Sequence, residues 1–410
     1  MASELRVNTI NSRSGLGTIT VSDTGAVFTG ITTIGSVTVD GGTVTGNLTG
    51  TASTATASAT AYGLSGSPTL SGITSVSTTN LTVNGNAYPA AGPLSNRNKI
   101  INGDMRIDQR NGGASFTMTG DSQYTLDRWI TRTYAGPGRF SVDQNSASPN
   151  NIDPSAKLTV TTTDTPGTYG YAFGHRVEGY NFSDLAYGSA AAKSATISFW
   201  VRSSLTGTYC FSVRNSDGSR SYVAEYSISS ADTWEYKTIT FAGDTSGTWL
   251  TSTGIGAILE WSLGSETVKQ TTAGSWQSGN YVTTSNQTDW IATNGATFYI
   301  TGVQLEVGSV ATPFEYRSFG DELARCQRYF VKNHGVLLEG YMQGGGSAMN
   351  YQSHWPVTMR QVPNITLSYQ VGTANESGSS AKIDGMTYRI VGTAAGHQFR
   401  YDLVDATAEL

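Results

Sequence analysis

Residues 296–330, ATFYITGVQLEVGSVATPFEYRSFGDELARCQRYF, contain the point at which the chain changes from a strand pattern to a helix pattern. On either side of Gly302 the large apolar residues alternate in opposite phases: Phe298 and Ile300, then Val303, Leu305 and Val307. Because side chains alternate with period two along a strand, this change of phase predicts a β-bulge at Gly302. We interpret this part as the last strand of a globular domain that spans residues 96–318.

A helical pattern follows Pro313, with apolar and aromatic residues at helical spacing: Phe319, Leu323, Cys326, Tyr329 and Phe330. Ser318 and Asp321 have the spacing of a weak capping box, although Gly320 is unfavourable in a first helical turn. We therefore expect a short linking helix, so that residues 319–410 form this helix and a small β-rich C-terminal tip.

The composition favours an all-β chain. Charged residues make up 13% of the 410 residues, about half of the roughly 25% that is typical of soluble domains. Thr, Val and Tyr favour strands, and the low charge argues against disorder. The net charge of −5 gives no reason to expect nucleic-acid binding.

Membrane insertion and a disulfide framework are not expected. No apolar run reaches the roughly 18 residues of a membrane helix, and the first residues lack the apolar core of a signal peptide. Cys210 and Cys326 are far apart and lie in different expected elements, so the sequence predicts no disulfide framework. The absence of a disulfide framework is compatible with assembly in a reducing cytoplasm.

Residues 26–95 contain few charged side chains, and none occurs from position 41 to position 96. Short apolar segments alternate with glycines, and one such chain has too few large apolar groups to bury a core alone. Three copies wound side by side would bury small apolar and Thr side chains on a shared axis, which predicts a fibrous trimeric β stalk. A flexible Gly/Ser/Thr tether is the alternative, and it fits best at residues 50–61.

Residues 96–318 contain the densest strand patterns of the chain. Four segments alternate cleanly: Ile197/Phe199/Val201, Tyr209/Phe211/Val213, Tyr222/Ala224/Tyr226/Ile228 and Ala257/Leu259/Trp261/Leu263. Asp217 and Gly218 provide hairpin-turn chemistry between the second and third segments. Closely spaced strands without helices between them predict an antiparallel β-sandwich.

Several stretches resemble tail-fibre proteins of tailed phages, most closely those of cyanophages and other marine phages. FYITGVQLEVG, ATPFEYRS and ELARCQRYF resemble the end of a sandwich domain in such fibres, and residues 96–129 (NRNKIINGDMRIDQRNGGASFTMTGDSQYTLDRW) resemble its start. Residues 354–367 (HWPVTMRQVPNITL) are similar to a phrase at the distal ends of many fibres. The sandwich is also similar to jelly-roll carbohydrate-binding modules. The resemblance implies a location in the virion tail.

The N-terminal SELRVNTI is similar to the start of other phage tail proteins, in which such a segment docks the fibre onto the particle. This similarity implies that residues 1–25 bind phage baseplate or tail proteins. The candidate docking residues are Leu5, Arg6, Val7 and Ile10. A frayed terminus is the alternative.

The sequence contains no catalytic signature, and we do not expect an enzyme. The four histidines lack metalloprotease spacing, and neither a nucleophile elbow nor a phosphate loop occurs. A glycan depolymerase with paired carboxylates is the less favoured alternative. The residues themselves imply no cofactor. A calcium ion is common in the similar binding modules, and Asn102, Asp104 and Asp127 are the oxygen ligands that this resemblance suggests.

Glycan binding requires aromatic faces together with a few polar groups. The candidates are Trp249, Trp276, Tyr281 and Trp290 in the sandwich, and Tyr341, Tyr351, His354 and Trp355 in the tip. Core packing or a seam between copies is the alternative for these aromatic residues. We predict a homotrimer that attaches the virion to host surface polysaccharide by multivalent, non-catalytic binding, mainly at the tip. A structural baseplate or neck fibre with protein partners is the alternative.

Overall fold

The computed structural model describes two short strands, Thr82–Val83 and Asn86–Ala87, and residues 95–410 apart from 150–151, 166, 168–169 and 265–266. The two short strands, β1 and β2, pair with each other. The predicted docking segment with Leu5, Arg6, Val7 and Ile10 lies outside the described residues, as does nearly all of the predicted trimeric stalk. The described residues belong to one compact unit.

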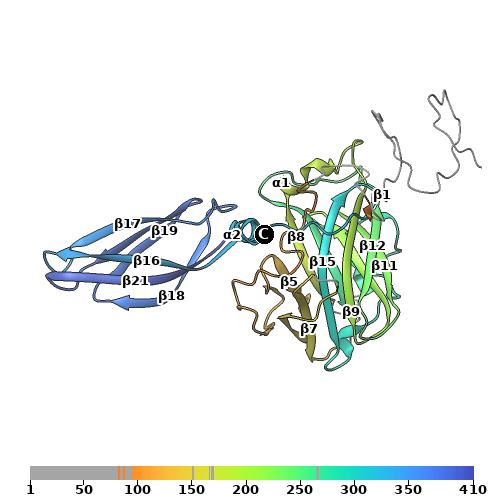
Figure 1. The fold of residues 1–410 in the computed structure, drawn as a ribbon, viewed down its shortest axis with the longest axis horizontal. Coiled ribbons are helices and arrows are strands. Elements are labelled where there is room, and N and C mark those ends of the chain that lie inside the picture. Colours follow the sequence, from red (N-terminus) through yellow and green to blue (C-terminus); the bar gives the residue numbers. More distant parts are fainter. Residues whose placement is uncertain are drawn as a thin grey trace, which may run out of the picture. The chain divides into compact units, whose positions relative to one another are not determined.

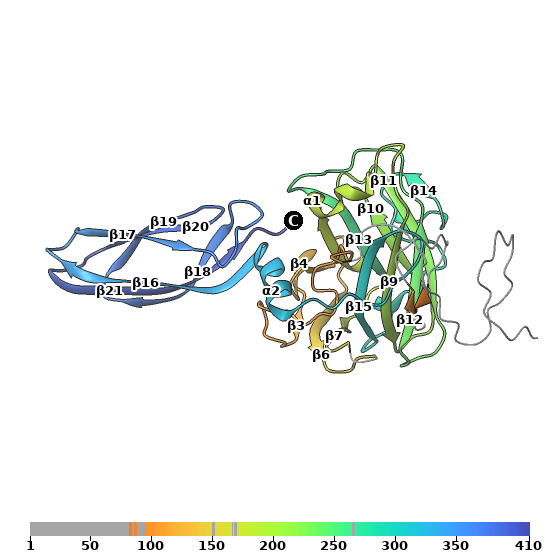
Figure 2. The ribbon, with the colours of Figure 1, turned by 45° about the horizontal axis from the view of Figure 1, so that its top comes forward.

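Two antiparallel sheets form a sandwich, as predicted (Figures 1 and 2). The seven-stranded sheet has the order β14 (Trp276–Ser278), β11 (Arg220–Ile228), β10 (Gly207–Arg214), β13 (Ile255–Gly264), β8 (Tyr171–Glu178), β5 (Trp129–Arg132) and β4 (Ser122–Tyr124). The six-stranded sheet has the order β12 (Glu235–Phe241), β9 (Ala195–Ser203), β15 (Thr297–Val307), β7 (Ser155–Thr162), β6 (Arg139–Asn145) and β3 (Phe116–Thr117).

The core of the sandwich includes the alternating residues that the sequence identifies. All members of the four predicted segments are buried and belong to one cluster. Phe199 from the six-stranded sheet meets Trp261 from the other sheet edge to face, with ring centroids 5.5 Å apart. β10 and β11 form the predicted hairpin, and Gly218 adopts the positive φ of +70° that this turn requires.

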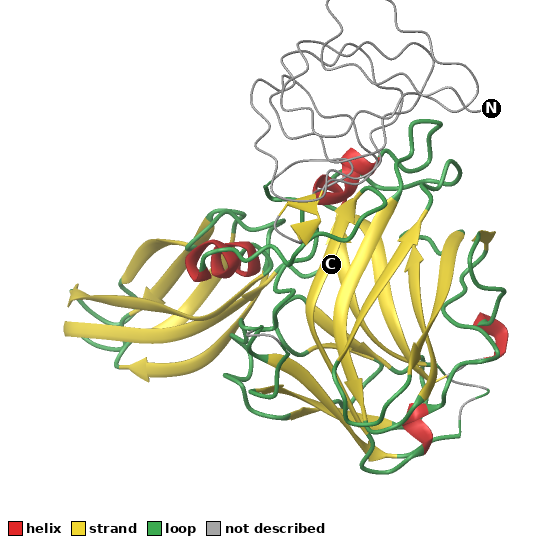
Figure 3. Ribbon diagram, turned by 45° about the vertical axis from the view of Figure 1, so that its right-hand side comes forward, coloured by secondary structure: helices red, strands yellow, loops and turns green. Residues whose placement is uncertain are grey.

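Few helices interrupt the strands (Figure 3). The one-turn helix α1 (Gly179–Phe182) and three 3₁₀ turns (Ser183–Leu185, Thr267–Lys269 and Trp290–Ala292) lie in connections within the sandwich. The alternation of apolar residues contains no signal for these short turns. Among the described residues, we find no helix of the length and apolar character needed to span a bilayer.

The stretch around β15 folds as predicted. The register between β15 and β9 shifts between Thr301 and Gln304, and Gly302 has a φ of +61°, so the bulge is confirmed. Helix α2 (Phe319–Gln327) begins after Ser318, whose hydroxyl accepts a hydrogen bond from the Asp321 amide at 3.2 Å. The predicted cap is therefore confirmed as well.

Helix α2 packs against the start of the sandwich. Cys326 and Tyr329 are buried with Ile101 and Ile107 in a small apolar cluster, whereas Phe319 is 57% exposed. Both cysteines are free and buried.

The C-terminal unit contains two three-stranded sheets. One has the order β16 (Phe330–Met342), β21 (Gly396–Thr407) and β18 (Asn364–Gly372), and the other β17 (Ala348–His354), β20 (Gly385–Val391) and β19 (Asn375–Ala381). Their inner faces share a core of their own, which includes Val336, Leu338, Tyr388, Ile390 and Val404. The β-rich tip of the prediction is confirmed.

Candidate functional site

The start of the sandwich domain is held along its last strand. The amide of Lys99 donates to Leu305 O at 2.8 Å, and that of Val303 donates to Gly103 O at 2.9 Å. A Cβ at Gly103 would overlap the Val303 carbonyl oxygen, so this close approach requires glycine. Residues from the two ends of the domain therefore lie side by side.

Asn98 is the centre of this contact. Its Nδ2 donates to Val303 O at 3.0 Å, and its Oδ1 accepts from the amides of Ile100 at 2.9 Å and Leu305 at 3.1 Å. The side chain is 5% exposed, so water does not replace these bonds.

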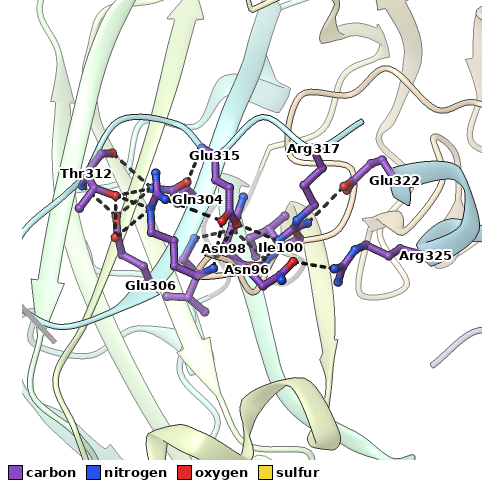
Figure 4. Close-up of polar contacts among 12 residues, drawn as sticks. Asn96, Asn98, Ile100, Gln304, Glu306, Thr312, Glu315, Arg317, Glu322 and Arg325 are labelled. Carbon is purple, nitrogen blue, oxygen red and sulfur yellow. Dashed lines mark hydrogen bonds and ion pairs between the residues drawn. The ribbon is translucent and has the colours of Figure 1, made fainter. Parts of the chain in front are cut away.

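Charged side chains extend the contact around Asn98 (Figure 4). Arg317 donates to Asn98 O and to Ile100 O, and its Nη1 lies 3.2 Å from Glu322 Oε2. Arg97 donates to Thr312 Oγ1 at 2.7 Å. We refer to this group as the closure network; its members are Arg97, Asn98, Gln304, Glu306, Thr312, Glu315, Arg317 and Glu322. It explains why the motifs at the two ends of the domain contain so many polar residues.

A small cleft of about 190 Å³ opens beside the closure network. It is lined by Asn96, Asn98, Lys99, Ile101, Tyr180, Asn181, Asp184 and Arg325. We refer to it as the Tyr180 cleft. Because sites for drug-sized ligands span roughly 300–1,000 Å³, this cleft matches one small polar unit rather than an extended ligand.

Tyr180 reaches the cleft from helix α1. The backbone there is fixed because the Tyr180 amide donates to Ser252 O at 3.0 Å and the Gly179 amide donates to Gly254 O at 2.8 Å. These backbone hydrogen bonds hold the loop in place. The Tyr180 side chain is 60% exposed, so the ring is accessible.

Charged and amide groups line the same cleft. Lys99 Nζ lies 2.6 Å from Asp184 Oδ2, and Arg325 Nη2 donates to Asn96 Oδ1 at 2.9 Å. These pairs are partly accessible and therefore contribute little to stability, but they hold donors and acceptors in fixed positions. Such a set can orient a polyhydroxylated ligand while the ring contacts its apolar face.

The aromatic candidates of the sandwich are mostly packing residues. Trp290 is fully buried in the core. Trp249 is 7% exposed and stacks on Phe182 with ring centroids 5.6 Å apart. Trp276 and Tyr281 are half-buried, and Trp276 meets Trp249 edge to face at 5.5 Å. In this structure Trp249 and Trp290 present no free ring face to a sugar.

The four candidates of the tip differ in exposure. Tyr341 is 68% exposed and Tyr351 is 45% exposed. His354 is exposed, whereas Trp355 is buried and donates from its indole nitrogen to Lys382 O at 2.9 Å. The indole of Trp355 is thus a packing group, and the other three side chains are accessible.

The three candidate metal ligands bond to the protein itself. The side-chain Nδ2 of Asn102 donates to Ile107 O and Asp127 O, and its Oδ1 accepts from the backbone amide of Ile107. Asp104 pairs with Arg106 at 2.8 Å. Burial raises the pKa of Asp127 to about 6, even though Arg110 and Gln109 favour its charged form. Within the described residues, no three or more His, Cys, Asp or Glu side chains are grouped as a metal site would require.

A second charged cluster lies on the outer side of the seven-stranded sheet. Glu260 is 1% exposed and contacts Arg214 at 2.6 Å, Arg132 at 3.2 Å and the Tyr134 hydroxyl at 2.7 Å. Burial alone would raise the pKa of Glu260, but the two guanidinium groups outweigh it and lower the pKa. Glu260 is therefore a buried, charged structural group rather than an accessible acid.

The Tyr180 cleft is not apparent from the sequence. Its residues come from three separated segments, around positions 96–101, 180–184 and 325. A polar and aromatic sequence (YNFSD, 180–184) between two predicted strands is the available signal, because such loops often contain binding residues.

Comparisons with known proteins give low structural similarity and no sequence family. No family model matches the chain, and no curated protein matches it either. The enzymatically active domain of tailspike protein 4 from bacteriophage CBA120 is 13% identical, with a TM-score of 0.27, over 54% of this chain and 24% of that one. The matched region thus spans about a quarter of the tailspike domain.

Two further structures match about half of this chain, and the match covers nearly the whole length of their own chains. A putative sugar-binding protein of Bacteroides thetaiotaomicron is 11% identical, with a TM-score of 0.31, over 52% of this chain and 100% of that one. The family 11 carbohydrate-binding module of a Clostridium thermocellum cellulase is 12% identical, with a TM-score of 0.25, over 48% of this chain and 98% of that one. These TM-scores are low, and the likeness carries no inference about the ligand of this chain.

Proposed function

We propose that this chain is a non-catalytic attachment protein of a phage tail that binds host surface polysaccharide in the Tyr180 cleft. The observation that carries the proposal is the accessible Tyr180 ring beside the fixed polar groups of Lys99, Asp184 and Arg325. A sugar unit offers a C–H face for the ring and hydroxyl groups for these partners. The location in a phage tail rests on the resemblance of the motifs in residues 96–129 and 296–330.

Attachment rather than cleavage fits the chemistry of the cleft. Asp184 is the one carboxylate among its lining residues, and Lys99 is paired with it. Most glycoside hydrolases use two carboxyl groups about 5–10 Å apart. The buried Glu260 does not supply the second group, because its oxygens contact arginine side chains and the Tyr134 hydroxyl.

A single small cleft binds weakly, and several copies compensate for this. We propose that the chain acts as a homotrimer whose N-terminal part binds phage tail proteins. Linked sites bind with a high effective concentration, so weak contacts add to strong adhesion. Tyr351 and His354 in the tip are accessible and are secondary candidates for contact with the host.

Retention of the full chain on immobilised bacterial surface polysaccharides tests this function. We expect saturable retention on a subset of the polysaccharides, without release of new reducing ends. Release of reducing ends would identify a depolymerase instead. Absence of retention on every polysaccharide, with retention by isolated phage baseplates, would identify a structural fibre with protein partners.

A further inference from the structure

We infer that the outer face of the sheet β16–β21–β18 is an interface between copies of this chain. Four of the thirteen exposed large apolar side chains of the described residues lie on this one face. They are Leu337, Tyr341, Val371 and Phe399. We refer to it as the apolar tip face. The inference is independent of the proposed sugar site, because a chain without sugar affinity would still expose these residues.

The register of the sheet places these residues next to one another. Leu337 on β16 is opposite Tyr401 on β21, and Tyr401 is opposite Val371 on β18. The exposed fractions of Leu337 and Val371 are 51% and 40%. Directly opposed side chains on one face of a sheet are in contact, so an apolar row crosses all three strands.

Aromatic side chains continue the face along the strands. Phe399 is 39% exposed and lies opposite Glu339, and Tyr341 lies opposite His397 with ring centroids 6.1 Å apart. The alternate residues Val336, Leu338 and Met342 of the same strand point into the core. The outer face of β16 thus carries the apolar side chains of Leu337 and Tyr341 on either side of the exposed Glu339, whereas a sheet face that lies in water is mostly polar.

The companion sheet of the tip provides an internal comparison. In β17–β20–β19 the corresponding outer row is Gln352, Thr387 and Ser380, all of which are polar. The inner residues of that sheet, such as Tyr388 and Ile390, are buried in the shared core. At this row the companion sheet is polar, whereas the row Leu337–Tyr401–Val371 of the other sheet is apolar and suited to burial against protein.

A second copy of the chain is the occupant that the sequence favours. The sequence predicts a trimeric stalk over residues 26–95, because positions 41–96 lack charge and have too few large apolar residues to bury a core within one chain. Copies that associate there carry their tips at a high effective concentration, so identical apolar faces meet readily. Burial of Leu337, Phe399 and their neighbours then adds to the association.

Cross-linking of single engineered cysteines in the full chain tests the interface. Cys210 and Cys326 are buried, so Leu337→Cys introduces the accessible thiol, and Gln352→Cys serves as the control on the polar face. With a short bismaleimide, left until the introduced thiols are consumed, we expect bands at multiples of the 43.4 kDa chain for Leu337→Cys. We expect at least a tenfold lower yield for Gln352→Cys.

Reaction with a maleimide dye provides a second measurement. We expect Leu337→Cys to react at least tenfold more slowly than Gln352→Cys, and Val371→Cys repeats the test on another strand. Equal cross-linking at positions 337 and 352 would overturn the inference. A 43.4 kDa monomer at micromolar concentration, with position 337 fully reactive, would overturn it as well. Slow dye reaction that appears only after polysaccharide is added would reassign the face to sugar binding.

Discussion

Replacement of Asn98 by alanine removes three buried hydrogen bonds, two of which join the two ends of the sandwich domain. The lost partners are Val303 O and the amides of Ile100 and Leu305. The closure network beyond Asn98 remains, because Glu315 accepts from the backbone amide of residue 98 and Arg317 donates to its carbonyl oxygen. The substitution therefore measures the side chain alone.

The size of the effect follows from the environment of the side chain. A net loss of about 1 kcal/mol for each bond gives about 3 kcal/mol, and amides left without an acceptor in a buried site raise the cost further. We expect the free energy of unfolding to fall by about 3–5 kcal/mol. For a domain of this size, about 2–4 °C per kcal/mol corresponds to a melting temperature lower by about 6–20 °C.

Urea unfolding followed by tryptophan fluorescence provides the assay, since seven of the eight tryptophans lie between residues 96 and 318. Asn96→Ala is the matched control: Asn96 is exposed, and its side chain bonds to Arg325. We expect the control to change stability by no more than about 0.5 kcal/mol. An Asn98→Ala midpoint indistinguishable from that of Asn96→Ala would refute the role assigned to the closure network.

Three other substitutions test separate features. Gly103→Ala forces a Cβ onto the Val303 carbonyl oxygen and should cost about 3 kcal/mol in urea unfolding; a wild-type midpoint would contradict this contact. Arg328→Met leaves the buried carboxylate of Glu178 without its bidentate partner and should cost about 2–3 kcal/mol, whereas a neutral result would show that the pair adds nothing. Asp127→Asn removes a buried carboxyl group. Burial raises the pKa of this group to about 6, above the pKa of roughly 3.9 that an aspartate has in an unfolded chain. Because the native state holds that proton more tightly, wild-type stability should fall relative to the variant as the pH rises from about 4 to about 6, and a pH-independent difference would exclude this titration.

Local patterns determine much of the fold. The change of phase at Gly302 is sufficient to locate the bulge, because period two leaves no other way to keep both runs in the core. Ser318 and Asp321 locate the start of α2 for a similarly local reason. Alternation in the four core segments separates inner from outer residues because each strand has one buried face.

The binding site depends on contacts that local patterns do not encode. Trp249 and Trp290 lie in connections between strands, yet both are buried, because Trp249 packs on Phe182 and Trp290 packs on core aromatic residues of the strands. Conversely, Tyr180 precedes the buried Phe182 in one short helix, and the sequence alone does not show which of the two rings is accessible. The cleft exists because the loop near Asp184 and helix α2 meet the segment at Lys99 in three dimensions.

The apolar tip face also depends on contacts that local sequence patterns do not encode. The alternation in β16 is weak because both faces carry apolar residues, and a single sequence does not distinguish a core from an interface between copies. Pairing with β21 resolves this, since Leu337 and Tyr341 then share the outer face.

Titration of a retained polysaccharide fragment into the wild-type chain and two tyrosine variants tests the proposed sugar site most directly. Tyr180→Ala removes the 60% exposed ring of the cleft, and Tyr316→Ala removes a 57% exposed ring outside it. We predict that calorimetry shows at least about tenfold weaker binding for Tyr180→Ala, or about 1.4 kcal/mol, and wild-type affinity for Tyr316→Ala. Wild-type affinity in both variants would contradict the account and would place recognition elsewhere on the chain.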